Sequence, residues 1–307
     1  DHPPVENVIQ DAHVKRTRPS VRASASAPPV ANPWSTNSPS RMLIPLTVLP
    51  THRPLDSVCA DMSATPALTA NGHPVDTSPE VYADLEPAND LLGDPIALRE
   101  AMAERGQLFF RQLLDPETVL AARHEILLKY AVIGEVDGRH PIDDAIAGDR
   151  AAVGVANLRA FSESVRSGPA YRAVTDAPEI LDFQADLLGG EVHTFDMRWP
   201  RFVRPGEGCG FHCDGPYMNR ATSRIFSCWI PLGRVHRHEG ALMILENSHR
   251  SDRLHAGYLG TDADLDGLKW LEDDPSDVLR SYGTRWLSTD FEPGDVLCFG
   301  MHMLHGA

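Results

Sequence analysis

The sequence predicts a mainly β fold in which helices cover a double-sheet jelly roll, built as one large domain. Helical patterns fill the chain after about residue 78, and short apolar runs separated by Gly, Pro, Asn and Asp fill it after about residue 190. Helices first and strands later suggest one domain with helices packed on sheets, and short, closely spaced strands are typical of sandwiches and jelly rolls. No internal repeat divides this region.

Composition describes a globular chain with an acidic balance. The 307 residues are 42% hydrophobic and 23% charged, and 28 Lys and Arg against 43 Asp and Glu leave a net charge of −15. Binding to nucleic acid depends on clustered cations, so we expect no nucleic-acid partner. No apolar run reaches the roughly 18 residues that cross a bilayer and no signal-peptide pattern opens the chain, so we expect no membrane partner and a cytoplasmic location. The 5 cysteines lack the paired spacing of a zinc site, which favours free thiols.

The start of the chain differs from the rest. Residues 1–61 are rich in Ala, Ser, Pro and Asn without a period. Such a stretch buries too little apolar surface to offset the entropy lost on ordering, so we predict disorder. The chain begins at Asp1, whereas Met62 resembles a natural start. We therefore interpret residues 1–77 as a disordered or mis-assigned N-terminal extension, and residues 78–307 as the domain.

The predicted helices have clear end signals. Gly106 follows one apolar-periodic stretch and suits the left-handed C′ position. Asp115 and Pro116 open another stretch as an N-cap and an N1 proline. Residues 134–165 have no steady period and predict a loop region with short helices. The helices are predicted at 95–105, 115–130, 169–188 and 269–280, and the strands at 107–114, 192–199, 210–214, 223–231, 241–245, 285–287 and 295–299.

The strand at 210–214 carries the candidate chemistry. Successive side chains of a strand point to opposite faces, so His212 and Asp214 share a face and Cys213 points away. A second histidine from a distant strand would complete the set of two His and one carboxylate that binds non-haem Fe(II) and leaves positions open. His302 and His305 are the candidates. Because they are three positions apart, only one of them can join this face of a strand, and spacing alone does not choose.

Short motifs follow one another in a fixed order in the segments 211–214, 229–232, 239–242, 247–250, 293–297 and 305–306. In this order they resemble the phytanoyl-CoA dioxygenase family of Fe(II)/2-oxoglutarate-dependent oxygenases. The resemblance covers roughly residues 93–307 and implies a double-stranded β-helix, a cupin-like jelly roll. It also implies that His305, with His212 and Asp214, forms the catalytic and metal-binding set. The implied cofactors are Fe(II), the co-substrate 2-oxoglutarate and O2.

The resemblance further implies a reaction. The oxo acid is oxidised to succinate and carbon dioxide while a C–H bond of a small-molecule or lipid-like substrate is hydroxylated. Asp214 favours hydroxylation, since related halogenases carry a small residue at its position. Trp229 matches a residue whose ring lines the 2-oxoglutarate pocket. The family's arginine for the second carboxylate lies about ten residues beyond the distal histidine, past Ala307, so we expect a missing C-terminal strand, with Arg220 and Arg224 as the nearest substitutes.

Two other functions are compatible with the same residues. One is a zinc-dependent, cupin-like hydrolase that uses a metal-bound water. The other is a non-catalytic metal-binding or scaffold protein on the same fold. We expect substrate-selecting residues at 134–168, 202–209 and 250–285, while the substrate itself and the oligomeric state are not predicted.

Overall fold

The structure is a computed structural model that describes residues 67–148, 158–195, 198–204, 208–218, 222, 224–267 and 270–307. Residues 1–61, for which we predicted disorder, lie outside these ranges. Residues 67–77, which we assigned to the extension, instead form an antiparallel hairpin of β1 (Thr69–Ala70) and β2 (His73–Pro74). Leu68, Ala70 and Val75 of this hairpin are buried, so the folded part begins before the predicted boundary at residue 78.

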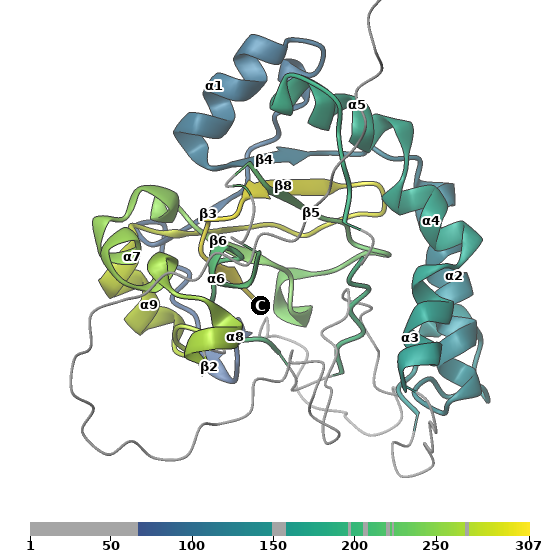
Figure 1. Cartoon of the computed structure of the whole chain (residues 1–307). Helices are drawn as coiled ribbons and strands as arrows, with labels where there is room; N and C mark the ends of the chain where they lie inside the picture. The colour runs from purple at the N-terminus through teal and green to yellow at the C-terminus, as the bar shows by residue number, and fades with distance from the viewer. Residues whose placement is uncertain are drawn as a thin grey trace, which may run out of the picture. The chain divides into compact units, whose positions relative to one another are not determined.

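Two sheets form the centre of the described chain (Figure 1). In spatial order the first, four-stranded sheet holds β3 (Tyr82–Asp84), β7 (Trp286–Ser288), β6 (Met243–Leu245) and β9 (His305–Gly306), and the second, three-stranded sheet holds β4 (Gln107–Phe110), β8 (Val296–Gly300) and β5 (Phe226–Trp229). In the four-stranded sheet β3 runs parallel to β7 and the other pairs are antiparallel, whereas the three-stranded sheet is antiparallel throughout.

Side chains alternate between the two faces of each strand, and this alternation divides the hydrophobic core into three clusters. The interior cluster lies between the sheets, because both sheets contribute to it: Phe109, Ile244, Leu287, Leu297 and Phe299. The intervening residues of the same strands point outward. The first outer cluster joins Leu108, Phe110, Val296 and Cys298 to helices, and the second outer cluster does the same for Tyr82, Met243, Leu245 and Trp286.

Helices cover the outer faces of both sheets (Figure 1). Their predicted start and end signals are present. Asp94 accepts hydrogen bonds from the first amides of α1, Gly106 ends α1 in the left-handed region, and Asp115 caps α2. The helices are α1 (Pro95–Arg105), α2 (Pro116–Val132), α3 (Leu158–Arg166), α4 (Pro169–Thr175), α5 (Pro178–Leu188), α6 (Gly215–Met218), α7 (Asp252–Ala256), α8 (Ala263–Asp266) and α9 (Pro275–Tyr282), with short 3₁₀ helices at Asn89–Leu91, Ile142–Asp144, Arg237–Glu239, Ser248–Arg250 and Tyr258–Gly260.

The predicted jelly roll covered by helices is confirmed, with three local differences. The described parts of 192–199 hold no strand, and Phe195 there is half-exposed. The segment 210–214 forms only isolated bridges at Phe211 and His212 before α6 begins. The insert predicted at 269–280 is helical only in α9. Strands are short, so helices hold more of the described residues than strands do. Within the described ranges, no helix has both the length and the apolar character needed to cross a bilayer.

Candidate metal centre

His212, Asp214 and His305 come together in the structure. One potential ligand atom from each residue lies within 4.8 Å of the other two. The Nε2 atoms of His212 and His305 are 3.8 and 3.7 Å from Oδ1 of Asp214. All three residues are buried, with exposed fractions of 8%, 8% and 5%. Both rings therefore aim the same nitrogen at the same carboxylate oxygen, away from bulk water.

Backbone pairing places the two histidines side by side. The segment at His212 forms an antiparallel bridge with His305, and β9 is held in turn by β6, where Ile244 pairs with His305. On the opposite face of this segment, Phe211 and Cys213 are fully buried in the second outer cluster. The expected alternation is therefore present, although pairing on each side of the segment is limited to single bridges.

The remaining ring nitrogens fix how the imidazoles are oriented. Nδ1 of His212 lies 2.9 Å from the carbonyl oxygen of Gly210, and Nδ1 of His305 lies 3.0 Å from that of Met303. A carbonyl only accepts, so each Nδ1 carries the proton and each Nε2 keeps its lone pair. Ser227 on β5 donates its hydroxyl to Oδ2 of Asp214. In their neutral forms, the two imidazoles bind a metal through Nε2, and together with a carboxylate that has one oxygen held by Ser227 they are a donor set that fits Fe(II).

Burial and mutual charge set the ionisation of the triad. Burial, strengthened by the charge of His212, lowers the pKa of His305 to about 4 despite the opposing effect of Asp214. Burial alone raises the pKa of Asp214, but the charges of His305 and His212 and the Ser227 hydrogen bond outweigh it and lower that pKa below its ordinary value. At neutral pH, His305 is thus neutral and Asp214 is ionised, the states in which these groups bind a metal.

Aromatic rings surround the triad. The ring of Phe299 lies 4.5 Å from that of His305, and Tyr217 on α6 meets His212 edge-on at 5.8 Å. Trp229 is two positions after Ser227 on β5, so both side chains share one face of the strand. Its ring packs against Phe291 at 4.6 Å, beside the interior cluster. The role of Trp229 in a 2-oxoglutarate pocket stays a prediction.

The other sequence candidates are not part of this group of ligands. The ring of His302 contacts His255 at 5.2 Å, and only its backbone oxygen reaches toward Cys213. Arg224 is exposed and donates to the carbonyl oxygen of Leu188 at the end of α5. It therefore does not lie at the triad, although it is close to Asp214 in the sequence. Arg220 lies outside the described residues.

Three residues beside the triad were missed by sequence reasoning. Ser227 is one, and the others are Cys209, whose Sγ lies 3.7 Å from Nδ1 of His212, and Arg201, whose Nη1 lies 3.5 Å from that Sγ. Burial raises the pKa of Cys209, but the charges of His212 and Arg201 outweigh it and lower the pKa to about 6. No sequence pattern marks Arg201 or Ser227, which come from other segments, whereas Cys209 is only three positions before His212.

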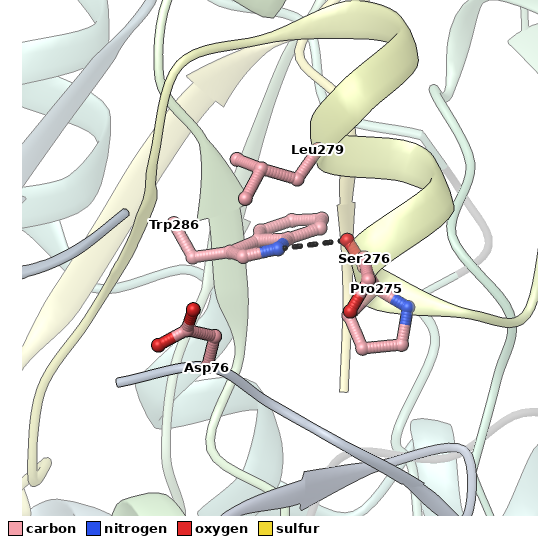
Figure 2. Close-up of a pocket in the computed structure, with 5 residues that line it drawn as sticks. All are labelled: Asp76, Pro275, Ser276, Leu279 and Trp286. Atoms are coloured by element: carbon pink, nitrogen blue, oxygen red, sulfur yellow. Dashed lines mark hydrogen bonds between the residues drawn. The ribbon is translucent and has the colours of Figure 1, made fainter. Parts of the chain in front are cut away.

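A hollow elsewhere on the fold does not belong to the triad. It is lined by Asp76, Pro275, Ser276, Leu279 and Trp286 (Figure 2). The indole Nε1 of Trp286 donates to the carbonyl oxygen of Pro275 at 3.2 Å, which ties β7 to the start of α9. This hollow is therefore a feature of the packing between the N-terminal hairpin and α9.

Comparisons with known proteins found one matching family model and several similar solved structures. The family model for phytanoyl-CoA dioxygenase (PhyH) matches residues 102–307. Among similar solved structures is the non-heme alpha-ketoglutarate-dependent carbocyclase SnoK from nogalamycin biosynthesis, with 16% identity, coverage of 72% of this chain and 80% of that chain, and a TM-score of 0.43. Another is EctD from S. alaskensis with 2-oxoglutarate and 5-hydroxyectoine, with 17% identity, coverage of 74% and 76%, and a TM-score of 0.43. A third is the epimerase SnoN in complex with Fe3+, alpha-ketoglutarate and nogalamycin RO, with 14% identity, coverage of 69% and 77%, and a TM-score of 0.40.

Proposed function

This chain belongs to the phytanoyl-CoA dioxygenase family, whose members are 2-oxoglutarate-dependent non-haem iron dioxygenases, and from that premise we propose that it hydroxylates a C–H bond of a small-molecule or lipid-like substrate. One observation carries the proposal: Nε2 of His212 and Nε2 of His305 both face Oδ1 of Asp214 in a buried group. Three such ligands leave the remaining positions of an Fe(II) ion open for small molecules.

In this proposal the triad holds the iron and its neighbours hold the triad. When bound, Fe(II) with 2-oxoglutarate and O2 supplies the oxidising power, and the oxo acid leaves as succinate and carbon dioxide. The carbonyl groups of Gly210 and Met303 keep both imidazoles in the tautomer that binds metal through Nε2. Ser227 holds Oδ2 of Asp214, which leaves Oδ1 for the iron. The buried ring of Phe299 keeps water from the side of His305.

The carboxylate at position 214 favours hydroxylation over halogenation. A halide can occupy an iron position only where the protein does not supply its own carboxylate. Asp214 is buried, ionised at neutral pH and already in place beside both histidines. The expected product is therefore an alcohol.

Succinate formation from 2-oxoglutarate tests this function. With Fe(II), the wild-type protein is expected to form succinate in the presence of a substrate from a broad panel of small molecules and lipids. His212→Ala and His305→Ala remove a ligand and should abolish turnover, while the matched variant His302→Ala should retain it, because His302 lies outside the triad.

Two outcomes would count against the proposal. If Zn(II) in place of Fe(II) gives a hydrolytic activity and no succinate is formed with either metal, the zinc hydrolase alternative is favoured. If the wild-type protein binds Fe(II) but shows no turnover across the panel, a non-catalytic metal-binding function is favoured.

A further inference from the structure

The next inference rests on the proposed function, because it concerns how the site takes its co-substrate. 2-Oxoglutarate carries two carboxylates, and a carboxylate withdrawn from water needs a charged or hydrogen-bonding partner. An arginine suits this need, since its planar guanidinium can donate to both oxygens at once. Arg224 donates to the carbonyl oxygen of Leu188 and does not lie with the triad, so it does not meet this need.

Three arginines lie on the segment 198–204, and two of them are already paired. Arg198 forms an ion pair with Asp176 at 2.5 Å, and Arg204 forms one with Glu135 at 2.6 Å. Arg201 differs. Its polar contact in the described chain is the thiol of Cys209, and no carboxylate of the described residues lies within ion-pair distance of it. The partly buried guanidinium of Arg201 therefore has N–H groups that donate to none of the described residues.

The packing of this segment directs Arg201 toward the triad. Phe202 stacks on Tyr130 at 4.7 Å and belongs to the first outer cluster, whereas Val203 packs against the interior cluster between the sheets. Neighbouring side chains thus go to opposite sides of the segment. Arg201 meets the thiol of Cys209, and the Sγ of Cys209 is 3.7 Å from Nδ1 of His212.

We propose that Arg201 binds a carboxylate of 2-oxoglutarate at the triad. The guanidinium is separated from His212 by one thiol, it has unused donors, and the segment that carries it is anchored by the stacked ring of Phe202 and by the ion pair of Arg204.

A purely structural role for Arg201 predicts something different. If Arg201 served only to hold Cys209, and through it His212, its replacement would weaken Fe(II) binding and would not discriminate among oxo acids. A role in carboxylate binding predicts unchanged Fe(II) affinity and a change in oxo-acid affinity. The two roles are therefore separable by binding measurements alone.

Calorimetric titration of the anaerobic, Fe(II)-loaded protein provides the test. 2-Oxoglutarate is titrated into wild type, Arg201→Met, Arg201→Lys and the matched control Arg224→Met. Arg201→Met should bind it at least about ten-fold more weakly, the loss expected for a charge-assisted, bidentate contact. Arg201→Lys should bind 2-oxoglutarate with an intermediate affinity, since lysine keeps the positive charge but lacks the planar guanidinium that donates to both oxygens. Arg224→Met should bind it with the affinity of wild type. Fe(II) affinity and the melting temperature of all variants are measured alongside.

A second ligand identifies the carboxylate. 2-Oxopentanoate has a methyl group where 2-oxoglutarate has its remote carboxylate. If Arg201→Met weakens binding of 2-oxoglutarate only, Arg201 binds the remote carboxylate, and if it weakens both ligands equally with Fe(II) affinity intact, Arg201 binds the carboxylate beside the oxo group. Unchanged 2-oxoglutarate affinity in Arg201→Met, or a loss of Fe(II) affinity that accounts for the change, overturns the inference and leaves the proposed function standing. Failure of the wild-type protein to bind 2-oxoglutarate overturns both.

Discussion

The amide of His212 donates to the carbonyl oxygen of His305, and the amide of His305 donates to the carbonyl oxygen of His212, each over 3.0 Å. This reciprocal pair joins segments that are far apart in the chain and sets their rings 4.4 Å apart, centroid to centroid. Whatever shifts β9 therefore shifts one candidate metal ligand relative to the other.

Gly306→Ala tests how tightly this pairing is packed. A Cβ at position 306 would lie 2.5 Å from a ring carbon of Phe211, which is fully buried and packs on Trp286 at 4.6 Å. Because that ring has no free space to move into, we expect unfolding in urea to show a loss of about 1–3 kcal/mol, together with weaker Fe(II) binding. Gly190→Ala is the control, since its Cβ would meet nothing within 4 Å. A Gly306→Ala protein as stable as wild type would contradict this account of the packing.

Ser227→Ala tests the hydroxyl that holds Asp214. Loss of this hydrogen bond frees Oδ2 and lets the carboxylate rotate. We expect Fe(II) affinity to fall by about ten-fold or more in an anaerobic titration, which is the usual effect of removing a group that orients a metal ligand. Ser167→Ala removes an exposed hydroxyl that bonds to Glu163 and should leave the affinity unchanged. Equal affinities for the two variants would mean that packing alone orients Asp214.

The pKa of His305 predicts acid sensitivity of the metal-free protein. Burial and the nearby charge of His212 lower this pKa from the ordinary 6.5 to about 4. The unfolded chain therefore takes up a proton at position 305 below about pH 6.5, whereas the folded chain does so only near pH 4, so the stabilisation is complete above 6.5 and is lost as pH falls from 6.5 toward 4. The pKa of His212 is raised, so its contribution is present below its ordinary pKa and is lost as pH rises through its folded pKa.

Urea unfolding of chelator-treated protein at pH 7 and pH 5 measures this effect. Wild type should lose more stability between the two pH values than His305→Asn, because the variant has no imidazole to protonate at this position. The same pH dependence in both proteins would assign the acid sensitivity to other groups.

Asp295→Ala tests a buried carboxylate that joins the ends of β4 and β8. Asp295 is fully buried and accepts from the guanidinium of Arg111 at 2.6 Å, from the amide of Gln112 at 3.0 Å and from the amide of Glu292 at 2.9 Å. Its removal leaves these donors without their acceptor, and we expect unfolding to become easier by about 3 kcal/mol.

Asp277→Ala is the matched control for that carboxylate. Asp277 forms an exposed ion pair with Arg280, and exposed pairs contribute at most about 1 kcal/mol. A loss of stability no larger for Asp295→Ala than for Asp277→Ala would show that solvent replaces the buried contacts.

The grouping of the candidate metal ligands was predictable from the sequence in part. The alternation of a strand was enough to put His212 and Asp214 on one face and Cys213 on the other. Spacing could not choose between His302 and His305, and the choice of His305 came from resemblance to the family. The structure brings His305 to the site through pairing of β9 with β6 and with the segment at His212, which are contacts between distant parts of the chain.

Local order, by contrast, was largely determined by the sequence alone. The helix α1 has the predicted bounds, because Asp94, Pro95 and Gly106 act on their nearest neighbours through hydrogen bonds and allowed backbone angles. Residues 192–199 lack the predicted strand in their described parts, since an apolar run becomes a strand only where a partner strand is available.

Tertiary structure alone decided the surroundings of the triad. Ser227 on β5 meets Asp214, and Arg201 meets Cys209, only because separate segments pack together. The sequence by itself determined which residue types could bind a metal and which of them share a face, because those properties depend on side-chain chemistry and on strand period. Cys209 is near His212 because it is three positions before it, but which cation and which hydroxyl accompany the triad depended on packing between separate segments, which no local pattern encodes.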